Sequence, residues 1–202
     1  MRTQSLIGTI MILLIAAANS YAGESALAAA KKIAGNYTGS WALYGVVDGN
    51  VVIKSRWTDV LTATEPVQDS GRAFVKVTDV MTFSDGSART SKFEEGYLAN
   101  ADGAAGDRFF ELNGSTVVFR KLTDNNWAFS TVPDENELRF LGFDPRTVLS
   151  ASHITVKTTT LQGNTDTDHV TRVTTVQWKD AAGALMSMQF VSMNGSHTRT
   201  IE

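Results

Sequence analysis

Hydrophobic and polar residues alternate along most of the chain that follows residue 35. A period of two is typical of strands that pack one face on a core and turn the other to solvent. The alternation is interrupted by turn dipeptides such as Asp48-Gly49, Asp85-Gly86 and Asn113-Gly114. The pattern therefore predicts an all-β protein of about nine or ten antiparallel strands joined by short turns.

The predicted strands are long enough to be tilted in a closed barrel. A meander of this kind leaves two unpaired edges, and closing the sheet on itself removes both of them. We therefore expect an up-and-down barrel, with a two-sheet sandwich as the alternative. The expected strands are 36–47, 51–63, 73–83, 88–99, 108–112, 115–122, 127–132, 152–161, 168–178 and 184–193, with 196–201 as an extension.

Two segments depart from the alternation and predict helices. Residues 24–34 are rich in Ala, acidic at their start and basic at their end, and are followed by Gly35. This order suits the helix dipole and a glycine stop. Asp134 with Glu137 forms the pattern of a capping box, so a second short helix is expected through Leu141.

The start of the chain has the pattern of a secretory signal peptide. Residues 6–18 are almost all apolar and follow Arg2. This run is too short to span a bilayer, which takes about 20 residues. Residues 20–22, Ser-Tyr-Ala, form a cleavage motif of small residues. We therefore expect a signal peptide over 1–22, with a retained membrane anchor as the alternative.

The mature protein is then expected to be one barrel domain over 23–202, secreted or periplasmic in a bacterium and without a membrane anchor. The 202 residues carry 18 basic and 21 acidic side chains, a net charge of −3. This balance argues against a nucleic-acid partner. The absence of Cys excludes disulfides, thiol nucleophiles and cysteine-ligated metals.

No motif of a catalytic metal site occurs, so no metal is expected. The oxygen-rich run 164–169 lacks the Gly and the closing Glu of a calcium loop. We interpret it as a solvated hairpin turn.

Two aspartates interrupt the apolar faces of neighbouring strands. Asp59 shares a face with Trp57, and Asp79 shares one with Met81. The loop between them is centred near residue 69, which predicts that they lie roughly opposite each other. Two inward carboxylates would repel, and one would keep its proton, as in an acid–base pair or a polar ligand anchor. The alternative is that both pair with Lys or Arg, or that a bulge turns them outward.

Further candidates come from later strands. Arg172 is a candidate electrostatic partner, and Met188 lies on a half-buried strand where its flexible side chain can adapt to a ligand or simply fill a core. The expected ligand-binding residues are Trp57, Asp59, Asp79, Met81, Arg172 and Met188.

The tripeptide Gly39-Ser40-Trp41, on the first strand and after a short helix, resembles the opening of lipocalin-like (calycin) β-barrels. The resemblance implies that Trp41 plugs the closed end of the barrel and that an Arg from the last strand lies across it. Arg199 is the candidate and Arg172 its rival. The chain lacks the cysteines of secreted animal lipocalins and looks like a bacterial branch.

The run from Gly35 to Trp41 also resembles the haem-binding nitrobindin barrels, which implies an axial histidine. His153, His169 and His197 are available. Apart from this resemblance we expect no cofactor.

Together these patterns predict an exported soluble barrel that binds a small hydrophobic or aromatic molecule in its interior. One alternative is an enzyme of the isomerase or lyase type that uses Asp59 and Asp79 as an acid–base pair. The other is a structural or interaction protein whose barrel is filled by side chains.

Overall fold

A computed structural model of the protein describes residues 24–200. The predicted signal peptide, 1–22, lies outside the described residues, and the division of the chain at residue 23 stays a prediction. Among the described residues, no helix has the length and apolar character needed to cross a membrane.

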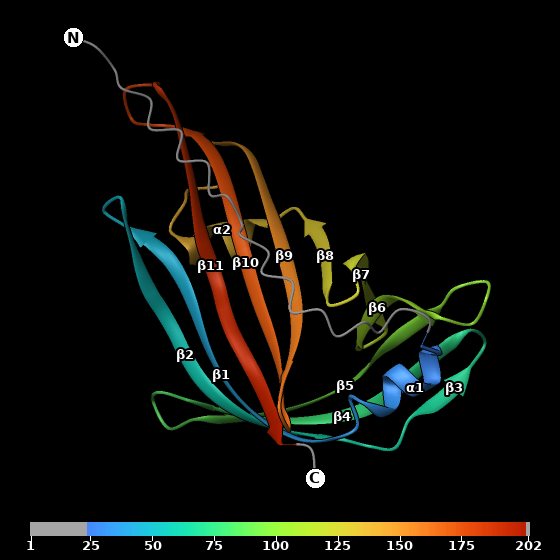
Figure 1. Ribbon diagram of the computed structural model, residues 1–202. Helices are drawn as coiled ribbons and strands as arrows, with labels where there is room; N and C mark the ends of the chain where they lie inside the picture. The colour runs from blue at the N-terminus through green and yellow to red at the C-terminus, as the bar shows by residue number, and fades with distance from the viewer. Residues whose placement is uncertain (1–23, 201–202) are drawn as a thin grey trace.

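The described residues form two short helices and a series of antiparallel strands (Figure 1). Their bounds are α1 Ala26–Lys31, β1 Gly35–Val47, β2 Asn50–Ala63, β3 Val67–Asp69, β4 Arg72–Phe83, β5 Ala88–Ala99, β6 Ala105–Leu112, β7 Ser115–Thr123, β8 Asn126–Thr131, α2 Glu135–Leu141, β9 Val148–Gln162, β10 Thr165–Lys179 and β11 Leu185–Thr200.

The strands close into a barrel in sequence order. The first and last strands, β1 and β11, pair from Thr38↔Thr198 to Leu43↔Met193. The short strand β3 pairs with β4 alone, while β2 pairs directly with β4 and completes the ring of ten strands. The prediction of an all-β up-and-down barrel with an N-terminal helix is therefore confirmed.

Helix α1 covers one end of the barrel, beside β4 and β5 (Figure 1). Ser25 caps it by accepting a hydrogen bond from the Ala28 amide, and Ala26, Ala29 and Ala30 are buried. Small side chains let the helix lie close to the strands. The other buried members of this core are Ile33, Tyr37, Leu61, Ala63, Ala73, Val75, Val77, Tyr97, Ala105 and Trp127.

Helix α2 packs against the opposite half of the long strands. The expected capping box between Asp134 and Glu137 is present. Leu141 and the following Phe143 pack with three buried residues near the far ends of β1, β10 and β11. These are Val46, Val176 and Phe190.

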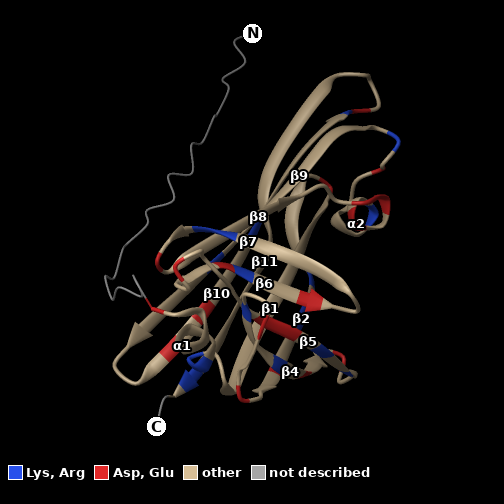
Figure 2. Cartoon of the chain, turned by 90° about the vertical axis from the view of Figure 1, so that its right-hand side faces the viewer, with Lys and Arg blue, Asp and Glu red and all other residues tan. Residues whose placement is uncertain are grey.

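The barrel interior therefore lies between the two helices. The far half of the long strands carries few charged residues (Figure 2), and β11 has no Lys, Arg, Asp or Glu before Arg199.

Candidate ligand-binding cavity

The interior holds a cavity of about 460 Å³. Inward-facing side chains from most strands of the ring line it, and they divide into a large apolar set and a smaller charged set. The apolar lining includes Trp41, Trp57, Met81, Phe93, Phe110, Leu112, Val117, Phe119, Phe129, Val170 and Met193. The ionisable lining is Asp59, Asp79, Arg89, Glu95, Arg108, Lys157, Arg172 and His197.

Two tryptophans form one wall of the cavity. Trp41 on β1 pairs across the sheet with Trp57 on β2, and their rings stack with centroids 5.8 Å apart and planes at 8°. On its other side, Trp41 lies against Gly195 of β11. A Cβ atom at Gly195 would lie only 2.1 Å from the Trp41 ring, so the bare backbone is what lets this indole lie flat.

Asp59 lies beside this wall and is 5% exposed. Its Oδ2 is 3.1 Å from Nε2 of His197, whose ring also meets the edge of Trp41. A Cβ atom at Gly39 would come within 2.1 Å of Oδ1 of Asp59 and 2.4 Å of the His197 ring. The glycine of the Gly-x-Trp motif thus makes room for the contact between aspartate and histidine.

Asp79 lies next to this pair but not directly opposite Asp59. The register of β2 and β4 pairs Asp59 with Met81 and Leu61 with Asp79. The two aspartates are therefore diagonal neighbours, roughly opposite as expected, and the register differs by two residues from the one that a loop centred at residue 69 predicts. Both carboxylates nevertheless face the cavity.

The environment of Asp79 favours its neutral form. The residue is 9% exposed. Burial raises the pKa of Asp79 to about 6, with a further contribution from the charge of Asp59, while His197 acts in the opposite direction. Oδ1 of Asp79 and Oδ1 of Asp59 are buried without a hydrogen-bond partner in the described part of the chain.

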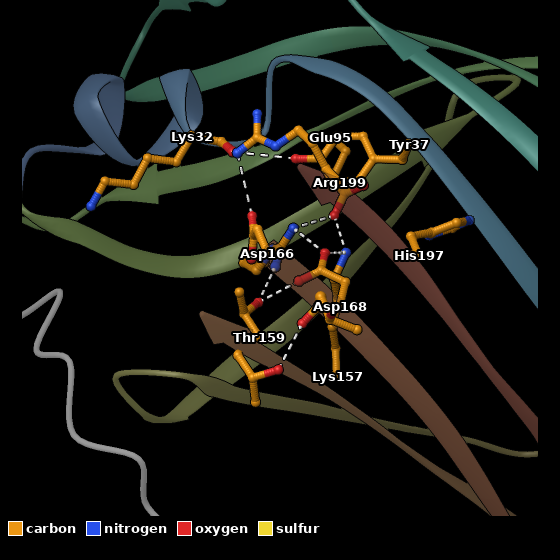
Figure 3. A network of polar contacts seen from close by, with 12 residues as sticks. Lys32, Tyr37, Glu95, Lys157, Thr159, Asp166, Asp168, His197 and Arg199 are labelled. Atoms are coloured by element: carbon orange, nitrogen blue, oxygen red, sulfur yellow. Dashed lines mark hydrogen bonds and ion pairs between the residues drawn. The ribbon is translucent and has the colours of Figure 1, made fainter. Parts of the chain in front are cut away.

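A network of buried charges forms the floor of the cavity, at the end of the barrel that α1 covers (Figure 3). Arg108 is 2.5 Å from Glu95 and 3.4 Å from Asp168. Lys157 pairs with Glu95 and lies 2.9 Å from Asp168. The two cations and two anions neutralise one another, and Thr159 adds a hydroxyl contact to Asp168.

These contacts determine the ionisation of the acids. Burial alone would raise the pKa of Glu95 and of Asp168, but Lys157 and Arg108 outweigh it and lower the pKa of both carboxyls. The charged forms are therefore the stable ones inside the fold.

Sequence reasoning missed this network. Asp166 and Asp168 are only 6% and 8% exposed. The interpretation of 164–169 as a solvated turn is thus wrong from residue 165 onward, because β10 begins at Thr165 and turns both aspartates inward. The available signal was that every second residue of β9 around Lys157 is polar, on the strand face that turns inward.

Arg199 has a structural place at the closed end (Figure 3). Its guanidinium lies 5.0 Å from the centre of the Tyr37 ring and 3.3 Å from Asp166. It also donates to the carbonyl oxygens of Lys32 and Ala34, just after α1. Arg199 thus ties the end of the helix to the last strand.

The expected contact between Arg199 and Trp41 is wrong. Gly195 stands opposite Trp41, four residues along β11 from Arg199. An arginine of the last strand does cover an aromatic ring of the first strand, but that ring is Tyr37. Trp41 is instead part of the cavity wall.

Arg172 and α2 meet on the other side of the cavity. Nη1 of Arg172 is 3.5 Å from Oε1 of Glu137, and its Nε donates to Thr155 at 3.3 Å. The other oxygen of Glu137 is 3.8 Å from Nε2 of His153. Burial, and then the charge of Arg172, lower the pKa of His153. Glu137 therefore links α2 to the inner wall.

One predicted ligand-binding residue lies elsewhere. Met188 packs in the cluster beneath α2 and does not line the cavity. The methionine of β11 that lines the cavity is Met193. Met188 lies five residues before it along β11, and Met193 faces the cavity next to a bulge, where Arg172 pairs with Met193 and Val173 with Val191.

The three histidines are widely separated. His153 is buried against Thr174, and His169 is exposed. His197 alone of the three lines the cavity, with its Nε2 engaged by Asp59. Within residues 24–200, no group of three or more His, Asp or Glu is placed to hold a metal ion.

In comparisons with known proteins, no family model, no curated protein and no solved structure matches this chain. The geometry of the cavity is therefore the observation that indicates a function.

Proposed function

We propose that the protein binds a small, largely apolar or aromatic molecule inside its barrel. The observation that carries the proposal is the cavity of about 460 Å³ with its aromatic wall. Concave, mostly apolar sites with a few placed polar groups are the usual form of small-molecule sites. A barrel filled by its own side chains would leave no such space.

The paired aromatic rings around the cavity support this proposal. The ring centroids of Phe93 and Phe110 are 4.5 Å apart, and those of Phe119 and Phe129 are 4.6 Å apart. All four line the cavity and are only half-buried within it. A ligand that covered these faces would remove apolar surface from water, which contributes a favourable free energy of about 25 cal/mol per Å² buried.

A lipocalin-like assignment and export belong to the same proposal. The closed antiparallel ring and a Gly-x-Trp motif at the start of β1 are consistent with that superfamily. The contact of Arg199 with Tyr37, in place of Trp41, is a local departure from its pattern. Export would follow from a signal peptide over residues 1–22, and an intact mass of the exported protein tests this.

The binding proposal is tested with N-phenyl-1-naphthylamine, a neutral apolar dye whose fluorescence rises in dry surroundings. We expect saturable binding of one dye per chain. Val117→Trp, inside the cavity, should weaken binding about tenfold or more because the indole occupies the site. Val60→Trp, on the outer face of β2 and 52% exposed, is the matched control and should leave binding unchanged. Equal binding by both variants would contradict the proposal.

A second candidate function is acid–base catalysis in the same cavity. The observation that favours it is Asp79, whose pKa is raised to about 6 beside the contact of Asp59 with His197. A carboxyl that titrates near neutrality can take and return a proton in an isomerisation or elimination.

This candidate is tested on a molecule that co-purifies with the exported protein. Native mass spectrometry identifies the molecule. Incubation with the protein in D₂O then shows whether a carbon-bound hydrogen of that molecule is exchanged for deuterium. Exchange that is lost in Asp79→Asn would support catalysis. Binding without exchange would leave the protein a binder.

A further inference from the structure

We propose that the cavity selects an organic amine, whose protonated nitrogen lies between Asp59 and Asp79 while its apolar or aromatic body fills the phenylalanine-lined side. This inference rests on the proposed function, since it names the ligand class of the same site. We call the group Asp59, Asp79, Trp41 and Trp57 the acidic corner.

The distribution of charge within the cavity supports this choice. On the floor, Arg108 and Lys157 are neutralised by Glu95 and Asp168. Elsewhere on the wall, Arg172 is paired with Glu137 of α2.

The acidic corner has no such compensation. Among residues 24–200, Asp59 contacts Nε2 of His197 at 3.1 Å, and no Lys or Arg pairs with Asp59 or Asp79. Arg89, also in the lining, is exposed at the rim. At pH 7.5, above its pKa of about 6, Asp79 is ionised, and the corner then carries a surplus of negative charge that a cationic ligand would neutralise.

The hydrogen-bonding state of the corner indicates a ligand that donates. Each aspartate is more than nine-tenths buried and keeps one carboxylate oxygen without a donor. A buried polar atom without a partner is costly, so a ligand N–H that reaches it gains more than the same bond would in water. An ammonium group has several N–H donors and can serve both carboxylates.

The tryptophan wall suits a cation as well. The rings of Trp41 and Trp57 stack on each other and line the same space as the two carboxylates. An indole face attracts a nearby cation through its quadrupole, most strongly where water is excluded. Carboxylates and indole faces together distinguish an amine from a neutral or anionic molecule of the same shape.

The test compares three compounds with the same indole body and two-carbon chain: tryptamine, tryptophol and indole-3-propionate. Each competes with N-phenyl-1-naphthylamine for the wild-type protein at pH 7.5, and calorimetry measures each directly. We expect tryptamine to bind about tenfold more tightly than tryptophol, and indole-3-propionate to bind least.

Substitutions in the acidic corner then test whether its carboxylates cause the preference for tryptamine. Asp79→Asn should reduce the advantage of tryptamine to about twofold or less while the affinity for tryptophol stays unchanged. Asp59→Asn should act in the same direction, although it also alters the contact with His197. Asp48→Asn, in an exposed turn at positive φ where asparagine is well tolerated, is the control and should change nothing.

The possible results separate the two proposals. If the dye binds but the three indoles compete equally, or the propionate competes best, the amine inference is overturned and the binding function stands. The same holds if both aspartate variants keep the preference for tryptamine. If neither the dye nor any indole binds, the binding function is overturned and the inference falls with it. Binding of tryptamine without the dye, lost in Asp79→Asn, would support the inference.

Discussion

At the scale of single residues, two glycines decide how the cavity wall is built. Gly39 leaves space for the contact between Asp59 and His197, and Gly195 leaves space for the ring of Trp41. Neither has a positive φ, so close approach rather than backbone conformation is what requires glycine. The Gly-x-Trp motif therefore has a local physical reason in this chain.

Gly195→Ala should move Trp41 off its stacked position. The added Cβ would meet the ring at 2.1 Å, so the indole or the strand must shift. We expect a loss of about 1–3 kcal/mol in the free energy of unfolding, as for other overpacked sites. Near-ultraviolet circular dichroism should show a weaker signal from the tryptophan pair. Ser196→Ala, the next position along β11, is the control, and an unchanged spectrum in Gly195→Ala would contradict the account.

Asp79→Asn should become more stabilising, relative to wild type, as the pH rises. The folded-state pKa of about 6 lies above the ordinary 3.8, so the folded state binds this proton more tightly than the unfolded chain. The stabilisation from protonated Asp79 is complete below about pH 4 and is lost as the pH rises through 6. Asparagine lacks this loss, so its advantage should grow by up to about 3 kcal/mol.

Urea unfolding of both proteins at pH 4, 5, 6 and 7 measures this difference. The exposed substitution Asp48→Asn should give a difference that does not vary with pH. A flat difference for Asp79→Asn as well would show that Asp79 is not held in its neutral form.

The sequence predicted the residues of the acidic corner better than their contacts. Strand alternation was enough to turn Asp59 and Asp79 inward, since a face of one strand is a local property. Their offset depended on the length of the connection through β3, which alternation does not determine. The resemblance predicts that Arg199 lies across Trp41, whereas the strand register places Arg199 beside Tyr37.

At the scale of elements, α2 contacts the cavity lining through one charged side chain, Glu137, which faces Arg172. Glu137 completes the capping box and also faces Arg172 and His153. The capping role could be predicted from the spacing between Asp134 and Glu137 along the chain. The contacts with β9 and β10 were not, because they join residues far apart in sequence.

Glu137→Gln should loosen α2 while preserving its cap. Glutamine can still accept the hydrogen bond of the Asp134 amide, but it removes the charge that faces Arg172. We expect faster amide exchange in residues 135–141 and no change in the barrel strands. Glu135→Gln, on the exposed side of the same helix beside Arg139, is the matched control. Equal exchange in both variants would mean that the contact with Arg172 does not hold the helix.

At the scale of the whole molecule, the fold combines an apolar end under α1, a charged floor and a partly empty interior. The apolar end and the ring closure follow from alternation, from turn chemistry and from the need to hide strand edges. The charged floor could not be foreseen in the same way, because Glu95, Arg108, Lys157 and Asp168 come from four different strands.

Lys157→Met should be strongly destabilising. The substitution leaves Glu95 and Asp168 buried with Arg108 as their remaining cationic partner in the network. Breaking a buried ion pair from one side costs about 3–5 kcal/mol. Urea unfolding measures the loss, with Lys76→Met on the exposed face of β4 as the control. A loss below 1 kcal/mol, as is usual for exposed pairs, would contradict the structural role of the network.

The proposed function requires that the interior of the barrel is a ligand site. A crystal structure of the protein grown with N-phenyl-1-naphthylamine tests this requirement. We expect one dye molecule inside the ring, between the Trp41–Trp57 wall and the rings of Phe119 and Phe129. A barrel whose interior is filled by its own side chains, with the dye absent or bound only on the outer surface, would contradict it.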